Sequence, residues 1–98
     1  MTRSRIERIR EKIRLRQYDM TAHAMEEMAE DFLDIVDVEK AILNGRLVRI
    51  DKNDPRGTTY VIEGTAADGA TPVGVVGRFT TIGSYLIITI YAITEFEG

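Results

Sequence analysis

The chain has no cysteine, no tryptophan, one histidine and two prolines among 98 residues. Without cysteine, it can form neither a disulfide nor a thiolate metal site. With His23 as the single histidine, a multi-histidine zinc site within one chain is also excluded, and carboxylates are the remaining metal ligands. We therefore expect no metal site and no cofactor.

Long apolar runs are absent as well. No stretch approaches the roughly 20 residues that span a bilayer, and the start, MTRSRIERIREKIRLRQ, lacks the apolar centre of a secretory signal. We therefore expect no membrane association and a cytoplasmic location. The length predicts a single domain over residues 1–98.

Charge is unevenly distributed. Residues 1–20 carry seven basic and three acidic side chains, whereas the other 78 residues carry six basic and 13 acidic ones. A basic N-terminal segment is suited to an acidic partner or to nucleic acid, and a solvated helix face with Glu–Arg pairs is the alternative. The run 26–39 holds seven acids and no base, which favours a solvated surface over a site for a cation or a basic partner.

Three helices are predicted before residue 45. In the first, over residues 3–16, Ile6, Ile9 and Ile13 form one narrow apolar stripe. So thin a stripe predicts packing on the chain's own sheet or on a second chain, which makes a homodimer one expectation. Tyr18–Met20 is predicted to be a short connection.

The second and third helices have start signals. Thr21 is a predicted N-cap, followed by a helix with one apolar face (Met25, Met28, Ala29, Phe32) and one polar face (His23, Glu27, Glu30, Asp34). His23 is therefore expected to point outward. Asp34 and Asp37 resemble a capping box for the third helix, which Asn44-Gly45 is expected to end through a left-handed glycine.

From residue 46 the pattern becomes strand-like. Short turns separate four predicted strands, at 46–50, 58–65, 71–79 and 85–93. The last is the most apolar and is expected to lie inside the sheet, and the glycines of 71–79 indicate a bulge or a close backbone approach. The predicted class is α+β, with N-terminal helices packed on one face of a four-stranded antiparallel sheet.

In order and spacing, these motifs resemble a bacterial family known as domain of unknown function 4258. The resemblance covers nearly the whole chain and rests on Tyr18, Thr21, His23-Ala24, Met28, Val38, Asn44-Gly45, Asp54-Pro55-Arg56-Gly57, Asp68-Gly69 and Ile87-Ile88-Thr89-Ile90-Tyr91. It implies a RelE-like fold, similar to RelE-like and MqsR-like toxins that cut messenger RNA. It also implies a zinc-finger antitoxin as protein partner.

The chain departs from that pattern at three positions. Family members commonly carry arginine where this chain has Glu27 and near Asp31, and often histidine where it has Gly74. Because phosphate contacts supply much of the affinity for RNA, acids at these positions predict weaker RNA binding.

His23 is the leading catalytic candidate, because histidine is best suited to proton transfer near neutral pH. The alternative is that it covers the start of its helix. Tyr91 and Tyr60 are candidates for stacking on RNA, although strand tyrosines more often pack against the sheet. Arg78 is a candidate for stabilising charge on a phosphate, or for pairing with a nearby carboxylate.

Two functions follow. The first is a metal-independent ribonuclease or RNA-binding protein of a toxin–antitoxin pair. In it His23 is the acid or base, Tyr91 is a candidate for orienting the RNA, and Arg78 is a candidate for stabilising negative charge. The second is a non-catalytic protein-interaction module that kept the fold and lost the basic site, and that binds through a sheet edge or the N-terminal helix.

Overall fold

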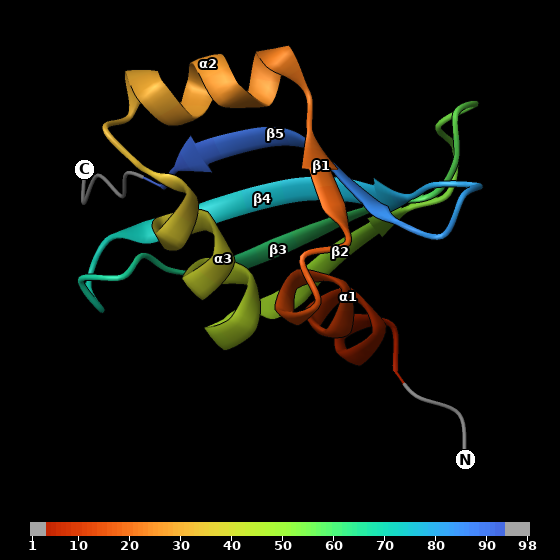
Figure 1. The fold of residues 1–98 in the computed structure, drawn as a ribbon, viewed down its shortest axis with the longest axis horizontal. Coiled ribbons are helices and arrows are strands. Elements are labelled where there is room, and N and C mark those ends of the chain that lie inside the picture. Colours follow the sequence, from red (N-terminus) through yellow and green to blue (C-terminus); the bar gives the residue numbers. More distant parts are fainter. Residues whose placement is uncertain (1–3, 94–98) are drawn as a thin grey trace.

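A computed structural model of the chain describes residues 4–93 (Figure 1). Within this range three helices precede residue 45 and strands and turns follow it, as predicted. The elements in chain order are α1 (Arg5–Arg14), β1 (Tyr18–Met20), α2 (Ala22–Glu30), α3 (Ile35–Asn44), β2 (Arg46–Asp51), β3 (Thr59–Thr65), β4 (Pro72–Phe79) and β5 (Tyr85–Ala92).

The sheet has five strands in the order β1-β5-β4-β3-β2, and it is mixed. The expectation of four antiparallel strands was wrong, because the segment predicted as a connection is a strand. β1 pairs in parallel with the start of β5, in the register Tyr18↔Tyr85 and Met20↔Ile87. Three residues are too few to show an alternating pattern, and a parallel partner so distant leaves no turn signal between the two strands. The pairing gives β5 a neighbour on each side, as expected of an interior strand.

Local start signals placed the helices well. The Thr21 hydroxyl accepts a hydrogen bond from the Ala24 N–H at 3.1 Å, and Asp34 and Asp37 form a reciprocal capping box. Gly45 follows α3 but is extended rather than left-handed, so that expectation was wrong. Glycine is needed there because a Cβ atom would lie only 2.6 Å from the carbonyl oxygen of Glu63.

One hydrophobic core lies between the sheet and the helices. Figure 1 shows α1 and α3 against one face of the sheet and α2 running along β5 at its edge. Ile9 and Ile13 of α1 are buried, so this helix packs on its own domain. The largest fully buried side chains of the core are Tyr85, Ile9, Ile42, Ile62, Ile87, Ile90, Val38, Val73 and Val75. Among residues 4–93, no helix has the length and apolarity needed to cross a membrane.

Two carboxylates, one on α2 and one at the C-terminal end of that helix, cover the part of β5 that extends beyond β1. Glu27 Oε1 accepts a hydrogen bond from the backbone N–H of Ile90 at 3.0 Å, and Asp31 Oδ2 accepts one from Ala92 at 2.9 Å. Alternate residues of a strand direct their N–H groups to the same edge, and acceptors four residues apart along the helix match that spacing. The two side chains therefore satisfy donors that would otherwise form an open sheet edge.

Candidate functional site

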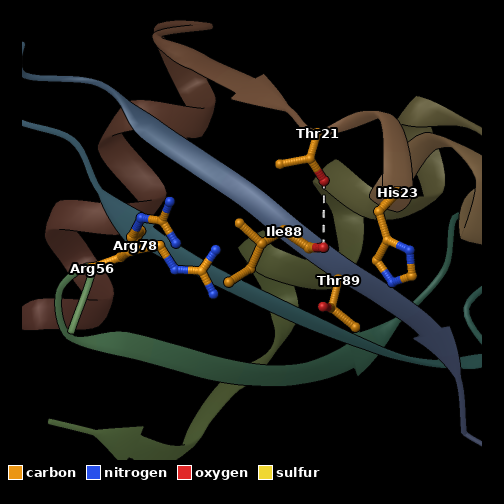
Figure 2. Close-up of a pocket in the computed structure, with 6 residues that line it drawn as sticks. All are labelled: Thr21, His23, Arg56, Arg78, Ile88 and Thr89. Atoms are coloured by element: carbon orange, nitrogen blue, oxygen red, sulfur yellow. Dashed lines mark hydrogen bonds between the residues drawn. The ribbon is translucent and has the colours of Figure 1, made fainter. Parts of the chain in front are cut away.

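A pocket of about 310 Å³ lies beside β5 where α2 begins. Figure 2 shows two guanidinium groups at one end and the imidazole at the other, with Ile88 and Thr89 between them. The structure therefore brings together two of the predicted site residues, His23 and Arg78, which are distant in sequence. The pocket is lined by Thr21, His23, Arg56, Arg78, Ile88 and Thr89.

His23 occupies the first turn of α2 and points outward, as predicted, with 66% of its side chain exposed. Its Nε2 atom lies 3.3 Å from Glu27 Oε1, the same oxygen that accepts the Ile90 N–H. Because the hydrogen bond from β5 fixes the position of the Glu27 carboxylate, the carboxylate can in turn fix the orientation of the imidazole. Within residues 4–93, Nδ1 has no hydrogen-bond partner and is available to a ligand.

Thr21 fixes the start of α2 to the strand. Its hydroxyl accepts the N-cap hydrogen bond and donates to the Ile88 carbonyl at 3.4 Å (Figure 2), while its backbone N–H donates to Ile87 at 3.0 Å. The position of His23, two residues later, is therefore set by β5.

A bulge in β5 shapes the floor of the pocket. Thr89 pairs with Val76 and Ile87 with Gly77, which leaves Ile88 as an extra residue. A bulge directs consecutive side chains to one side of a sheet, and Ile88 and Thr89 accordingly both line the pocket. The glycines of residues 71–79 had predicted a bulge or a close approach in that strand; the register does shift between Val76 and Gly77, but the extra residue lies on β5.

The turn between β2 and β3 brings Arg56 to the pocket. Asp54 Oδ1 accepts a hydrogen bond from the Arg56 N–H at 2.8 Å and lies 3.6 Å from Arg56 Nε. The backbone hydrogen bond, together with the Arg56 and Arg78 charges, lowers the pKa of Asp54. A Cβ atom on Gly57 would lie 3.8 Å from Arg78 Cδ, so this turn reaches Arg78.

Arg78 has no carboxylate within salt-bridge distance among the residues that the structure describes. The alternative of a structural ion pair is therefore not supported, although Asp54 is close enough to feel its charge. Arg78 is half-buried on β4 and keeps hydrogen-bond donors for a ligand.

Tyr91, the third predicted site residue, does not line the pocket. It lies two residues beyond Thr89, and strand side chains of that spacing share a face. Its ring lies against Gly74, the residue paired with it on β4. Burial raises the pKa of Tyr91, Glu63 adds to the rise, and Arg49 opposes it. The ring thus extends the surface beside the pocket without reaching into it.

Tyr60 is a packing residue, as the alternative for strand tyrosines predicted. It is 7% exposed, and its ring makes an edge contact with Phe79 at a centroid distance of 5.7 Å. Stacking on RNA is therefore excluded for Tyr60 in this structure.

Sequence reasoning missed Arg56, Thr21, Ile88 and Thr89 as site residues. For Arg56 a signal existed, because the Asp54–Gly57 motif was one of those that carried the family resemblance. It also missed that Glu27 and Asp31 bind backbone donors of β5. No group of three or more potential metal-ligating side chains occurs in the described part of the chain, residues 4–93.

Fold and site together define a small α+β domain with a basic pocket beside β5. A family model, Domain of unknown function (DUF4258), matches residues 20–92, and the chain belongs to this family. No curated protein and no solved structure matches the chain. The likeness to RelE-like and MqsR-like toxins has no support in these matches and stays a prediction.

Proposed function

We propose that the chain binds single-stranded RNA at this pocket and cleaves it without a metal ion. The observation that supports the proposal is the convergence of His23 with Arg56 and Arg78 on one pocket. Arginine is well suited to phosphate recognition because its planar group donates several hydrogen bonds. A volume of about 310 Å³ falls in the range of small-ligand sites, which is enough for a nucleotide phosphate with part of its sugar.

The chemistry is a transfer of the phosphoryl group within the RNA strand. The ribose 2′-oxygen attacks the adjacent phosphorus, a phosphorus–oxygen bond forms, and the bond to the 5′-oxygen of the next nucleotide breaks. The 2′-hydroxyl loses a proton and the leaving oxygen gains one. His23 carries out one of these two proton transfers, and solvent carries out the other.

The other residues have supporting roles in this proposal. Arg78 and Arg56 stabilise the charge on the phosphate oxygens as it develops. Glu27 holds the imidazole through Nε2, which fixes the orientation of the ring at the pocket. The Tyr91 ring provides a flat surface for a neighbouring base, which stacking proteins commonly use.

The proposal is tested by measuring affinity for a labelled single-stranded RNA against ionic strength, and cleavage on gels with a chelator present. We expect His23→Ala to lower the cleavage rate by about 10²–10⁴-fold with little change in affinity. Arg78→Ala and Arg56→Ala are expected to weaken binding and to reduce the salt slope by about one each. Lys40→Ala, which removes an exposed positive charge on α3 outside the pocket, is the control.

Two results would reject the proposal. If wild type shows no salt-dependent RNA binding, the non-catalytic interaction module becomes the better description. If wild type cleaves and His23→Ala cleaves equally fast, the histidine has no catalytic role. Circular dichroism of each variant separates loss of function from loss of fold.

A further inference from the structure

The helix that carries His23 exposes an apolar surface on its other side. Its predicted apolar face was expected to pack on the core, but Met25 is 52% exposed and Phe32, just past its end, is 95% exposed. Ile35 and Val36, in the first turn of α3, are 40% and 46% exposed. We name these four residues the α2–α3 apolar surface. Four exposed apolar side chains within twelve residues make this part of α2 and α3 a candidate interaction site.

Phe32 adds a second observation. It is left-handed, with φ of 56°, and its backbone N–H and that of Leu33 bond back to Ala29 and Met28. This is the hydrogen-bond pattern of a Schellman motif, whose left-handed position favours glycine. A phenylalanine there is unfavourable in conformation and gains almost no burial, and such outliers concentrate at functional positions.

Acidic residues surround this surface. Glu26 and Glu30 are exposed on α2, and neither has a partner among the described residues. Two copies joined symmetrically through this surface would bring the same acids together, which is unfavourable. The complementary surface must instead be basic and must carry an exposed apolar side chain.

The chain itself carries such a surface at the end of α1. Leu15 is 56% exposed between the exposed arginines Arg14 and Arg16. We name these three residues the α1 tip. Figure 1 shows α2 above the strands and α1 below them, on opposite sides of the domain, so one molecule does not join its own two surfaces.

We propose that the chain self-associates head to tail, with the α1 tip of one copy docked on the α2–α3 apolar surface of the next. Leu15 is the apolar anchor beside Phe32, and Arg14 and Arg16 face Glu26 and Glu30. A contact between two different surfaces forms a closed ring or an open chain, rather than a two-fold dimer. The contact does not involve the pocket residues, so it is independent of the proposed RNA chemistry.

Sedimentation velocity over a range of concentrations, at low and high salt, tests the proposal. We expect the wild-type sedimentation coefficient to rise with concentration and to rise less at high salt, because exposed charges are screened beyond about 10 Å at 0.1 M. Phe32→Gly suits the left-handed backbone, so it should fold while weakening association by about tenfold or more. Met20→Leu, which leaves both surfaces intact, is the control and should associate as wild type does.

Charge reversal tests the pairing directly. The double variant Glu26→Arg/Glu30→Arg and the double variant Arg14→Glu/Arg16→Glu should each be monomeric alone, because each then carries two surfaces of like charge. Mixed together, they should associate again. A wild type that stays monomeric at all concentrations overturns the proposal, and so does association that persists unchanged in Phe32→Gly and in both reversed variants.

Discussion

The carboxylate of Glu27 accepts the backbone N–H of Ile90 at 3.0 Å, which links α2 to the last strand. Its side chain is 24% exposed, so the hydrogen bond is partly shielded from water. We expect Glu27→Ala to lower the free energy of unfolding by about 1–3 kcal/mol, because a donor on β5 loses a charged acceptor. Urea unfolding measures this loss.

Two variants of α2 complete this experiment. Glu27→Gln keeps an acceptor oxygen and should cost less than Glu27→Ala. Glu26→Ala, one residue away and exposed, should stay within about 0.5 kcal/mol of wild type. Equal losses at residues 26 and 27 would show that the bond to Ile90 contributes nothing.

Gly74 and Tyr91 are expected to be coupled. The ring of Tyr91 fills the space that a side chain at Gly74 would need, so Gly74→Ala should destabilise the fold by about 1–3 kcal/mol. In Tyr91→Ala that space is free, and adding Gly74→Ala should then cost much less. Thermal unfolding of the two single variants and the double variant gives the coupling, and additive effects would contradict it.

Stability should fall at alkaline pH through Tyr18. Its hydroxyl donates to Glu39 Oε2 at 2.5 Å, and burial, with the Glu39 hydrogen bond and charge adding to it, raises the pKa of Tyr18. The folded chain therefore keeps the phenol proton where the unfolded chain has lost it. The resulting stabilisation is fully present below about pH 10 and is lost as pH rises further.

Unfolding free energies measured between neutral pH and about pH 12 check this expectation. Tyr18→Phe should be less stable than wild type near neutrality and should lose less stability as pH rises. Part of the slope should remain, because burial also raises the pKa of Tyr85. An identical pH slope in wild type and Tyr18→Phe would exclude the Tyr18–Glu39 pair as its source.

Replacing Phe32 by glycine should stabilise the monomer. The residue has φ of 56° and is 95% exposed. A left-handed backbone costs a residue with a Cβ atom about 1–2 kcal/mol, and glycine removes this cost while little packing is lost. The melting temperature, measured at low protein concentration, should rise by about 4–8 °C per kcal/mol. Phe32→Ala keeps a Cβ atom, so its melting temperature should not rise. A lower melting temperature in Phe32→Gly than in wild type would show that the ring packs on the domain.

The helices could be predicted because their signals are local. A cap such as Thr21 and its acceptor group lie within one turn, and the periodicity of Ile9 and Ile13 identifies a face to bury. Periodicity does not identify what a face meets, however. α2 lies along a sheet edge rather than across the sheet, so Ala24 is buried while Phe32 is exposed.

The candidate site was predictable residue by residue but not as an arrangement. His23 and Arg78 stood out by chemical type, yet their shared pocket depends on a bulge at Ile88 and on a turn that brings in Arg56. Tyr91 was placed on the right strand, but its ring packs on Gly74, outside the pocket. These placements come from sheet register, which one sequence specifies only through contacts between distant residues.

The pairing of β1 with β5 has a consequence for synthesis of the chain. Tyr18 is made early, but its strand partner Tyr85 belongs to the last strand. During translation, α1 and α2 therefore emerge long before the strand that connects them to the sheet exists. Closing that long loop carries an entropic penalty that rises only slowly with length, but it has to wait until β5 has been synthesised. Ribosome-bound fragments that end before β5 should accordingly leave residues 18–20 accessible to protease and should lack the pocket.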